Sequence, residues 1–478
     1  MILLFTNKQR NAVKTYQLSP PIHRMPTLTF LNHASFCVET EASILLVDPW
    51  LQGTAFHNGW ALLDGSTSNE EVLAHVGKAD KKLYIWYSHE HSDHFAVPFI
   101  KQMKAVRPDA KFIFHATLDK RVATFLRRSG YAVIESPEGV PCDIDSALSI
   151  TTWPYAGGDS FSLIKAGDTT ILNINDCAIR NIADAQLVKQ KVDRQSQCVD
   201  LLFTQFGYAN WVGNEDGRAD RRAAAQEKFD RIQIQDEVLQ PVHIVPFASF
   251  VYFCHPDNFY LNDEQNNPAS VRSSQALTNI QHKIFFLRPR DVIQLADTSM
   301  LSGQLGALSP AAEEHWNERI ATARPLEPDD QPQPSLDELI AAFKAYRRTL
   351  SLNFAFSLQL REVVGRIKPI NILLKDKDLV VRLSYLTGIK TTPAARTWNM
   401  SVTSEVFLFM LKNEYGFNAT RVNGRFRIGP GASMNMVVRF FSPQDHFRNG
   451  FGIRNPLVTM QRFITRVRNR FLKVRHAG

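Results

Sequence analysis

The stretch that decides the fold is Ser88-His89-Glu90-His91-Ser92-Asp93-His94, which directly follows the apolar run over residues 83–87. Alternate residues of an extended chain point to the same side, so the imidazoles of His89 and His91 are expected to face one way. Asp93 and His94 then present a second pair of potential ligands where the chain turns. Because a group this dense is expensive to bury without a cation, the stretch predicts a metal site at the end of a buried strand.

The alternative interpretation of this stretch is a solvated, histidine-rich loop. Histidine is scarce in the chain, at 14 of 478 residues, yet three histidines fall in the six positions from 89 to 94. Imidazole nitrogens combined with a carboxylate suit zinc, iron or manganese. The composition therefore favours a metal site over a loop.

The pattern HxHxDH resembles the metallo-β-lactamase superfamily, and the sequence before it agrees. Two short β-prone runs, residues 27–36 and 43–49, resemble the opening hairpin of that fold, and Asp48-Pro49 closes the second run. The resemblance implies an α/β fold, the αββα sandwich of this superfamily, with two divalent metal ions. Because this fold carries hydrolases, oxygenases and redox enzymes, it does not by itself identify the reaction.

Length and composition are those of a large soluble protein. A chain of 478 residues with 44% hydrophobic content can bury the cores of two or more domains. The net charge of +8 is a mild excess that favours an anionic small-molecule substrate, and no specific nucleic acid is predicted. Five scattered cysteines without a CxxC pair argue against a disulfide framework. No signal peptide or membrane span is predicted, so the expected location is cytoplasmic.

The pattern along the chain predicts four segments. We expect an N-terminal extension over residues 1–26, a metal domain over 27–300, a linker over 301–334 and an α+β accessory domain over 335–478. Short β-prone runs alternate with amphipathic stretches between 26 and 300, which is typical of α/β architecture. Four prolines between 325 and 334 cannot continue a helix or a central strand, and they predict the linker.

The C-terminal region predicts strands, a helix and a basic tail. Strands are expected at 371–374, 379–385, 419–422 and 425–428, and a helix at 404–413. The layout resembles sterol-carrier-protein-like modules, and the alternative is an unassigned α+β domain. From Met460 onward, an apolar stripe opposite a row of arginines predicts a basic amphipathic helix. Such a helix either docks its stripe on the protein body, which we favour, or makes peripheral contact with a membrane.

The superfamily resemblance implies further ligands at later strand ends. Asp176 ends an apolar run where the superfamily has a bridging aspartate, although a turn aspartate is the alternative. His255 fits the last histidine of the superfamily, while His243 lies within a strand and is expected to be structural. Where hydrolytic members carry another histidine, this chain has Asp159, which is either its substitute or a turn residue beside two glycines. A carboxylate there shifts the preference from zinc toward iron or manganese.

A narrower resemblance is carried by four segments between the metal stretch and residue 300. They occur in the same order as similar segments in the CMP-N-acetylneuraminate monooxygenase (hydroxylase) branch: 175–177, 206–211, 246–257 and 288–291. Members of that branch carry an N-terminal Rieske iron–sulfur domain, whose CxH and CxxH ligand pairs are absent from this sequence. The resemblance therefore implies an iron-dependent oxygenase that receives electrons from a separate electron-transfer protein.

This interpretation assigns a role to each candidate residue. One metal is held by His89, His91 and Asp159, the other by Asp93, His94 and His255, and Asp176 bridges the two. Three arginines after a Gly-rich loop are candidates for clamping a phosphate or carboxylate, although such a group is also typical of a solvated helix face: Arg218, Arg221 and Arg222.

Two other functions remain open from the sequence. In a zinc-type hydrolase of a phosphoester or acyl substrate, Asp93 orients the attacking water; the HxHxDH pattern favours this function, and the missing middle histidine disfavours it. In a non-catalytic lipid or membrane adaptor, the C-terminal module carries the activity. The intact ligand set makes the adaptor the less favoured of the two.

Overall fold

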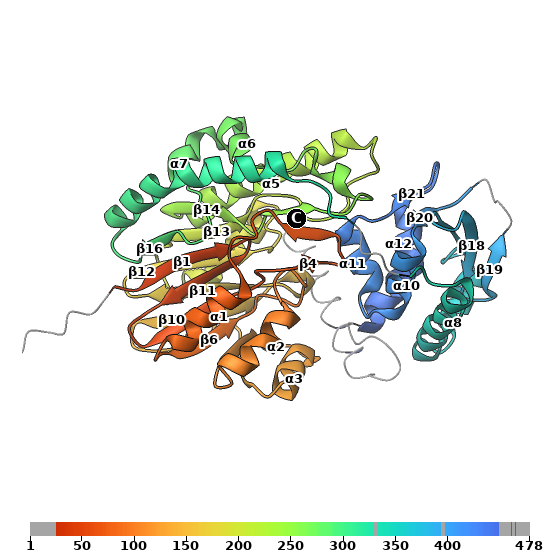
Figure 1. Cartoon of the computed structure of the whole chain (residues 1–478), viewed down its shortest axis with the longest axis horizontal. Helices are drawn as coiled ribbons and strands as arrows, with labels where there is room; N and C mark the ends of the chain where they lie inside the picture. The colour runs from red at the N-terminus through yellow and green to blue at the C-terminus, as the bar shows by residue number, and fades with distance from the viewer. Residues whose placement is uncertain (1–24, 328–331, 393–396, 449–459, 461–463, 465–478) are drawn as a thin grey trace, which may run out of the picture.

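The computed structural model describes residues 25–327, 332–392 and 397–448, together with Met460 and Ile464 (Figure 1). Within these ranges a large α/β domain is followed by a smaller α+β domain, in the predicted order. The predicted N-terminal extension and the predicted basic C-terminal helix fall almost entirely outside the described residues. The larger domain runs from residue 27 to 322 and the smaller from 336 to 448.

The first sheet of the large domain contains most of the strands near the predicted metal stretch. Its strand order is β16 (Val292–Gln294), β1 (Thr27–Asn32), β2 (Ser35–Glu39), β3 (Ser43–Val47), β6 (Lys82–Trp86), β7 (Lys111–His115) and β8 (Ala132–Ser136). Strands β3, β6, β7 and β8 pair in parallel. The carboxyl ends of these strands therefore meet at one edge of the sheet, where ligand-binding loops gather in α/β proteins.

The second sheet packs against the first. Its strand order is β14 (His243–Phe247), β13 (Leu201–Gln205), β12 (Thr169–Asn175), β11 (Ser160–Ala166), β10 (Leu148–Pro154) and β9 (Cys142–Asp143). The pairing of β12 with β13, and of β13 with β14, is parallel. All strands of this sheet lie in the stretch between residues 26 and 300 where short β-prone runs are predicted.

Burial along β3 shows how the layers are stacked. Successive side chains of a strand point to opposite faces of the sheet. Leu45 and Val47 pack in the core between the two sheets, whereas Ile44 and Leu46 pack against the outer helices. Both faces of the first sheet are therefore covered, which explains why its central strands are continuous apolar runs.

Helices cover both outer faces of the paired sheets (Figure 1). The first sheet is covered by α1 (Asn69–Lys78), α2 (Val97–Val106) and α3 (Arg121–Arg128). On the other side lie α4 (Ile182–Val192), α5 (Arg218–Leu239), α6 (Pro268–Ser273) and α7 (Thr298–Thr322). This arrangement is the αββα sandwich that the sequence predicted.

The predicted linker over residues 301–334 is wrong in its first two thirds. Residues 298–322 form the long helix α7, and its Leu301, Leu305 and Trp316 are fully buried against the sandwich. Asp297 caps the helix by accepting from the backbone amides of Ser299 and Met300. The proline-rich segment alone connects the two domains, and residues 328–331 of it lie outside the described part.

The C-terminal domain combines one sheet with a layer of helices. Its strand order is β19 (Gly388–Thr392), β18 (Leu379–Ser384), β17 (Ile370–Leu374), β20 (Met400–Val402) and β21 (Arg427–Ile428). Its helices are α8 (Leu336–Asn353), α9 (Ser357–Val363), α10 (Ser404–Lys412), α11 (Gly416–Asn423) and α12 (Met434–Arg448). The predicted cap holds: the hydroxyl of Ser335 accepts from the amide of Glu338 at the start of α8.

The strand predicted at 419–422 is wrong, because these residues lie in helix α11. The pair Asn423-Gly424, expected to be a hairpin turn, ends the helix instead. Gly424 has a φ of 69°, the left-handed conformation that favours glycine after a helix. Thr420 hydrogen-bonds back to the carbonyl of Gly416, so its side chain stabilises the helix locally.

The two domains are docked tightly at the carboxyl edge of the first sheet. A small sheet at this edge, β15 (Val251–Phe253), β5 (Trp60–Leu62) and β4 (Thr54–Ala55), carries the neighbouring loop around Phe56. The Asn423 amide donates to the Phe56 carbonyl at 3.0 Å, and Arg425 donates to the His57 carbonyl at 2.9 Å. No helix of the described residues is both long enough and apolar enough to cross a membrane.

Candidate metal centre

The predicted metal stretch forms a tight loop directly after β6. Tyr87 continues the buried strand, and Phe95 donates its amide to the His91 carbonyl at 2.7 Å, which closes the loop. His89, Asp93 and His94 are buried and His91 is partly exposed. The loop therefore turns the side chains of His89, Asp93 and His94 inward, at the carboxyl edge where the two sheets meet, and leaves Glu90 and Ser92 exposed.

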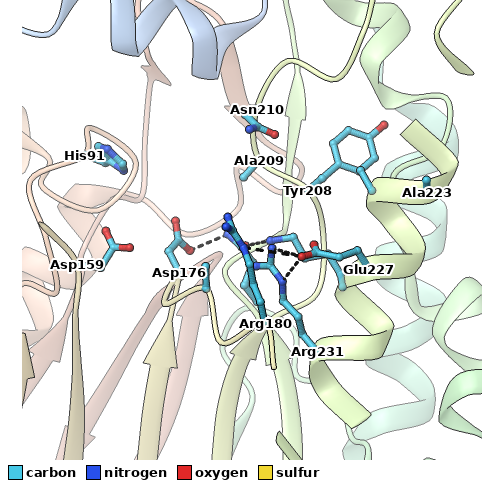
Figure 2. A pocket seen from close by; sticks show the side chains of 14 residues that line it. His91, Asp159, Asp176, Arg180, Tyr208, Ala209, Asn210, Ala223, Glu227 and Arg231 are labelled. Carbon is cyan, nitrogen blue, oxygen red and sulfur yellow. Dashed lines mark hydrogen bonds and ion pairs between the residues drawn. The ribbon is translucent and has the colours of Figure 1, made fainter. Parts of the chain in front are cut away.

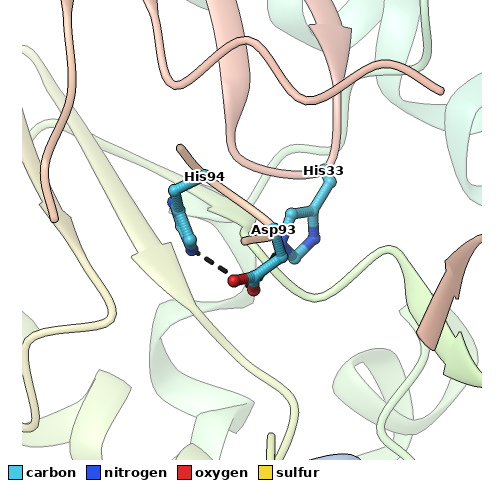
Figure 3. Close-up of side chains that lie close together, drawn as sticks. All are labelled: His33, Asp93 and His94. Atoms are coloured by element: carbon cyan, nitrogen blue, oxygen red, sulfur yellow. Dashed lines mark ion pairs between the residues drawn. The ribbon is translucent and has the colours of Figure 1, made fainter. Parts of the chain in front are cut away.

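One group of potential ligands joins this loop to the turn between β1 and β2 (Figure 3). Asp93 Oδ2 lies 3.5 Å from His33 Nε2 and 3.5 Å from His94 Nε2. The ring centroids of His33 and His94 are 5.6 Å apart. Donor atoms at this spacing can share one cation, because bonds from zinc to nitrogen or oxygen are about 2 Å long.

A second group brings in the end of β12. His94 Nε2 is 3.6 Å and His89 Nε2 is 4.0 Å from Asp176 Oδ2. His91 Nδ1 lies 2.9 Å from His89 Nε2. The structure thus brings together five of the seven predicted ligands, and we call them, with His33, the ligand cluster: His33, His89, His91, Asp93, His94 and Asp176.

The buried polar atoms of the ligand cluster fit a bound cation. Four buried atoms have no hydrogen-bond partner among the described residues: His33 Nδ1, His33 Nε2, His94 Nε2 and Asp93 Oδ1. Burying such atoms without partners is costly. Because His33 Nε2 and His94 Nε2 both lie 3.5 Å from Asp93 Oδ2, a metal ion held between them would give these ring nitrogens a partner. The nitrogen and carboxylate donors suit zinc, iron or manganese.

A buried carboxylate supports the ligand cluster from behind. Asp48, at the end of β3, is fully buried and accepts from both the amide and the hydroxyl of Ser88, at 2.8 and 2.7 Å. Its Oδ2 lies 3.1 Å from His94 Nδ1 and accepts from the Asn175 amide at 2.6 Å. A carboxylate on the far ring nitrogen fixes the orientation of a ligating histidine.

Burial and charge shift the pKa values of the cluster in opposite directions. Burial lowers the pKa of His89 well below its usual value. Burial also disfavours the charged form of His94, but Asp93 and Asp176 outweigh it and raise the pKa of His94. Burial disfavours the Asp93 carboxylate as well, but His94 and His33 hold the pKa of Asp93 well below its usual value. Burial disfavours the Asp176 carboxylate too, but His94 outweighs it and lowers the pKa of Asp176 to about 2. Both aspartates are therefore ionised, as metal ligation requires.

A chain of polar contacts leads from Asp176 into a cavity of about 650 Å³. Gln205, at the end of β13, donates its amide to Asp176 Oδ1 at 2.8 Å, and Lys228 of α5 donates to the amide oxygen of Gln205. Lys228 is only 7% exposed, and burial lowers its pKa to about 7. Three cations line this space, Arg180, Lys228 and Arg231, together with the carboxylates of Asp159, Asp176 and Glu227. We call it the basic cavity after the cations.

Asp159 lies at the edge of the ligand cluster, beside His91. Figure 2 shows both side chains on one side of the basic cavity, with Asp176 between them and Arg231. Two glycines with positive φ, Gly157 and Gly158, form the turn that places Asp159. Burial, then the charge of Asp176, raises the pKa of Asp159 to about 6. The carboxylate faces the cluster, although it is outside the groups whose donor atoms lie within 4.8 Å of one another.

The structure does not bring His255, the predicted last ligand, to the ligand cluster. Within the described part of the chain, the ligand groups do not include His255. Its Nδ1 accepts from the amide of Asp257 at 3.0 Å, and its charged neighbours are Arg425, Glu405 and Lys375 at the domain interface. The loop after β14 turns toward the C-terminal domain before it reaches His255. As predicted, His243 is structural: its ring nitrogens lie 3.0 Å from the Asp200 carbonyl and 2.7 Å from the Ser302 hydroxyl.

His33 takes the place that the sequence analysis gave to His255. It follows β1 and has a φ of 39°, an uncommon conformation for a residue other than glycine. Its carbonyl accepts from the Ala248 amide at 2.9 Å, which ties this turn to the loop after β14. One signal for His33 was available: a histidine directly after a buried strand, at the same sheet edge as the HxHxDH stretch.

The arginines predicted to clamp a substrate have structural partners instead. Arg221 is fully buried and bonds both oxygens of Asp263, at 2.7 and 2.8 Å. Arg218 and Arg222 bond Glu264 at 2.6 and 2.9 Å. Two cavities lie beside the ligand cluster, and none of the three arginines is among the described residues that line them.

Comparisons with known proteins cover the domain that holds the ligand cluster. Residues 27–208 match the family described as Beta-lactamase superfamily domain. Cytidine monophosphate-N-acetylneuraminic acid hydroxylase of Mus musculus is 27% identical over 264 residues, which are 52% of this chain and 43% of that protein. The Xenopus laevis protein of the same name is 28% identical over 284 residues, 55% of this chain and 46% of that protein.

A Mycobacterium tuberculosis protein named for a Rieske 2Fe-2S centre is 25% identical over 264 residues, 52% of this chain and 48% of that protein. The chain therefore spans less than half the length of these curated relatives.

Solved structures resemble the same domain at low identity. CmlA, a diiron β-hydroxylase from Streptomyces venezuelae, has a TM-score of 0.36 and 16% identity, covering 58% of this chain and 55% of that chain. The metallo-β-lactamase fold protein YhfI from Bacillus subtilis has a TM-score of 0.34 and 14% identity, covering 57% and 99%. The αββα layers observed in the fold agree with the match of residues 27–208 to the Beta-lactamase superfamily domain.

Proposed function

We propose that this chain is a dinuclear metal-dependent oxygenase of the hydroxylase type. Iron is the favoured metal, and zinc or manganese are the alternatives. His89, His91 and Asp159 would hold one ion, His33, Asp93 and His94 the other, and Asp176 would bridge them. Bound iron would supply the redox chemistry that activates dioxygen, which no side chain of the cluster supplies alone.

The observation that carries this proposal is the carboxylate of Asp159 beside His91. With Asp159, three carboxylates join four imidazoles around the two expected ion positions. Carboxylate donors harden a site and favour iron or manganese over zinc. The relatives at 27% and 28% identity over the same domain are named hydroxylases, which supports the same reaction class.

The protein's own residues would prepare the site. Asp48 orients the His94 ring through its 3.1 Å contact, and Ser88 contacts His89 Nδ1 at 2.9 Å. Gln205 holds Oδ1 of Asp176, so that Oδ2 faces His89 and His94. Such contacts pre-organise ligands and lower the cost of binding ions.

An oxygenase of this kind needs an electron donor. The sequence contains no CxH and CxxH ligand pairs of a Rieske centre. We propose that a separate iron–sulfur or flavin protein delivers electrons, and the relative named for a Rieske 2Fe-2S centre supports this class of donor.

The experiment that tests the proposal is metal analysis of protein purified without oxygen and with iron present. We expect about two iron ions per chain, with an absorption or Mössbauer signature of a coupled pair, and dioxygen consumption when a reductant is supplied. Zinc as the only metal at full occupancy would contradict the assignment.

A zinc-type hydrolase is the second candidate, and Asp93 favours it. Its Oδ1 atom is buried without a hydrogen-bond partner among the described residues, so it can orient a water molecule. Turnover of a phosphodiester or thioester by the zinc-loaded protein, with neither dioxygen nor reductant, would decide for the hydrolase.

A further inference from the structure

The ligand cluster lies between two cavities, and only one of them belongs to the metal domain alone. The basic cavity is enclosed by residues of the metal domain. The second cavity, of about 1100 Å³, is lined by both domains, and we call it the interdomain cleft. His91 and Asp159 line both spaces. The two cavities therefore meet at the ligand cluster.

We propose that the substrate spans both cavities: an anionic group binds Lys228 in the basic cavity, and an aromatic or aliphatic part lies in the interdomain cleft. The C-terminal domain then selects the substrate, since α10 and α11 form one wall of that cleft. This substrate class, an amphipathic carboxylate or phosphate, rests on the proposed metal-dependent activity.

Lys228 is the anchor for the anionic group. Its amine lines the basic cavity although the residue is 93% buried, and its hydrogen bond goes to a neutral amide, that of Gln205. Arg231, by contrast, is held by Glu227 at 2.8 and 2.5 Å. Within the described chain no carboxylate forms an ion pair with Lys228. A carboxylate or phosphate entering the cavity would supply the missing counter-charge.

The interdomain cleft supplies the apolar surface. The metal domain contributes Phe114 and Leu118, and Leu118 is 65% exposed. From the opposite side, Phe409 of α10 and Ala419 and Val422 of α11 face the same space. Apolar walls with a few polar groups are typical of small-molecule sites.

The wall from the C-terminal domain is held rigidly. Asn258 donates to the carbonyls of both Gly59 and Asn423, at 2.8 and 2.5 Å. A Cβ atom on Gly59 would lie 2.3 Å from the Cβ of Asn423, so the backbones are in close contact there. The ring of His57 stacks on Phe409 at 4.0 Å between centroids. A wall fixed in this way can discriminate between substrates, because its shape is set before binding.

The test uses the metal-loaded full chain and two probes, inorganic phosphate and 4-phenylbutyrate, with binding measured by calorimetry or ligand-observed NMR. Replacing Lys228→Met should weaken both probes by about tenfold or more. Lys228→Gln is the second variant in case the first does not fold. Lys101→Met, on the exposed face of α2, is the matched control and should change neither affinity.

Two tryptophan variants test the cleft, one from each wall. Leu118→Trp and Asn418→Trp should each weaken 4-phenylbutyrate by about tenfold and leave phosphate unchanged. Phe356→Trp, on an exposed position of the C-terminal domain, is the control.

Each arm of this test can overturn the proposal. Probe binding that Lys228→Met leaves unchanged would show that the anion binds elsewhere, such as on the metals. An effect of Leu118→Trp without one of Asn418→Trp would remove the C-terminal domain from the site. Iron content is measured on the same samples, so a wrong metal assignment is distinguished from a wrong substrate site.

Discussion

Two buried polar clusters of the metal domain differ in one respect, the supply of partners. In the ligand cluster, His33, His94 and Asp93 retain buried atoms without hydrogen-bond partners in the described chain. Around Arg221, a fully buried guanidinium bonds both oxygens of Asp263 and the carbonyls of Asn214 and Glu215. The first cluster is incomplete without a cation and the second is complete as it stands. Both clusters are buried, so burial does not distinguish them. The presence or absence of hydrogen-bond partners for the buried polar atoms distinguishes the structural cluster from the candidate binding site.

The largest effect on stability is expected at the cluster around Arg221, where every polar group named above has a partner. Arg221→Leu leaves Asp263 and two carbonyls without their donor, so the free energy of unfolding should fall by about 3–5 kcal/mol. Urea denaturation measures this change. Arg222→Leu, on the same helix but with 69% of its side chain exposed, is the control and should leave the denaturation midpoint unchanged. Equal effects of the two variants would remove the distinction between them.

The ligand cluster should respond in the opposite way. His94→Ala should lower metal affinity by more than about 100-fold, since even supporting residues behind a metal ligand contribute 10–100-fold. The metal-free protein should lose less stability than it loses when a fully partnered histidine is removed. The unpartnered Nε2 leaves with the ring, although the Nδ1 contact with Asp48 is lost as well. Metal content by mass spectrometry and denaturation of the stripped protein give the two readouts.

His243 is the matched histidine for that variant. It is buried with both ring nitrogens in contact with partners. His243→Ala should therefore lower stability without reducing bound metal. If His94→Ala destabilised the stripped protein as much as His243→Ala does, the ligand cluster would be structural.

A third comparison separates His33 from His255. His33 belongs to the ligand cluster, whereas His255 lies by Asp257 at the domain interface. His33→Ala should reduce bound metal from about two ions per chain to about one, and His255→Ala should leave it at two. The reverse result would restore the ligand set expected from the superfamily resemblance and reject the one drawn from the structure.

A variant of Asp48 tests whether a carboxylate on the far nitrogen of His94 contributes to metal affinity. Asp48→Asn keeps the shape of the side chain but removes the charge that faces His94 Nδ1, so metal affinity should fall by about 10–100-fold. Asp145→Asn is the control, because that carboxylate bonds Thr40 at 2.6 Å instead of a cluster histidine. Equal metal affinity in the two variants would exclude a role for Asp48 in orienting His94.

Sequence patterns were sufficient for what depends on local order. The β-prone runs over 27–36 and 43–49 and the dense stretch from 89 to 94 indicated the sandwich and its metal edge, because both follow from neighbours along the chain. The sequence could not decide whether His33 or His255 lies at the metal site, since each follows a strand. The path of the loop after β14 decides it, because that loop carries His255 away from the ligand cluster. Helix α7 was missed because its apolar residues are interrupted by two glycines and Pro310.

The hydrogen-bond partners of buried polar side chains were the property that the sequence predicted least well. Arg221 and Lys228 lie two turns apart on one helix. Asp263 forms an ion pair with Arg221, whereas no carboxylate of the described residues forms one with Lys228, and nothing in the sequence shows this difference. The same limit applies to the strand predicted at 419–422. The pair Asn423-Gly424 suits both a hairpin and a helix end, and packing against Leu261 and Asn258 decides between them.

The smallest effect is expected where the two domains meet, and it depends on pH. Glu405 bonds His57 at 2.6 Å and Arg425 at 2.8 Å. Burial alone would raise the pKa of Glu405, but His57 and Arg425 outweigh it and lower the pKa to about 2. The unfolded chain holds that proton more tightly, so the stabilisation is complete above about pH 4.5 and is lost as the pH falls toward 2.

Because the pair is partly exposed, its contribution should be at most about 1 kcal/mol. The stability difference between the wild-type chain and Glu405→Gln should therefore be constant from pH 7 to about 5 and then shrink as the solution is acidified. Glu338→Gln, exposed and paired with Lys412, gives the matched curve for a surface glutamate. A difference that grew on acidification would mean that Glu405 is protonated in the folded protein. The interdomain wall beside the cleft would still be held by the amides of Asn258 and Asn423.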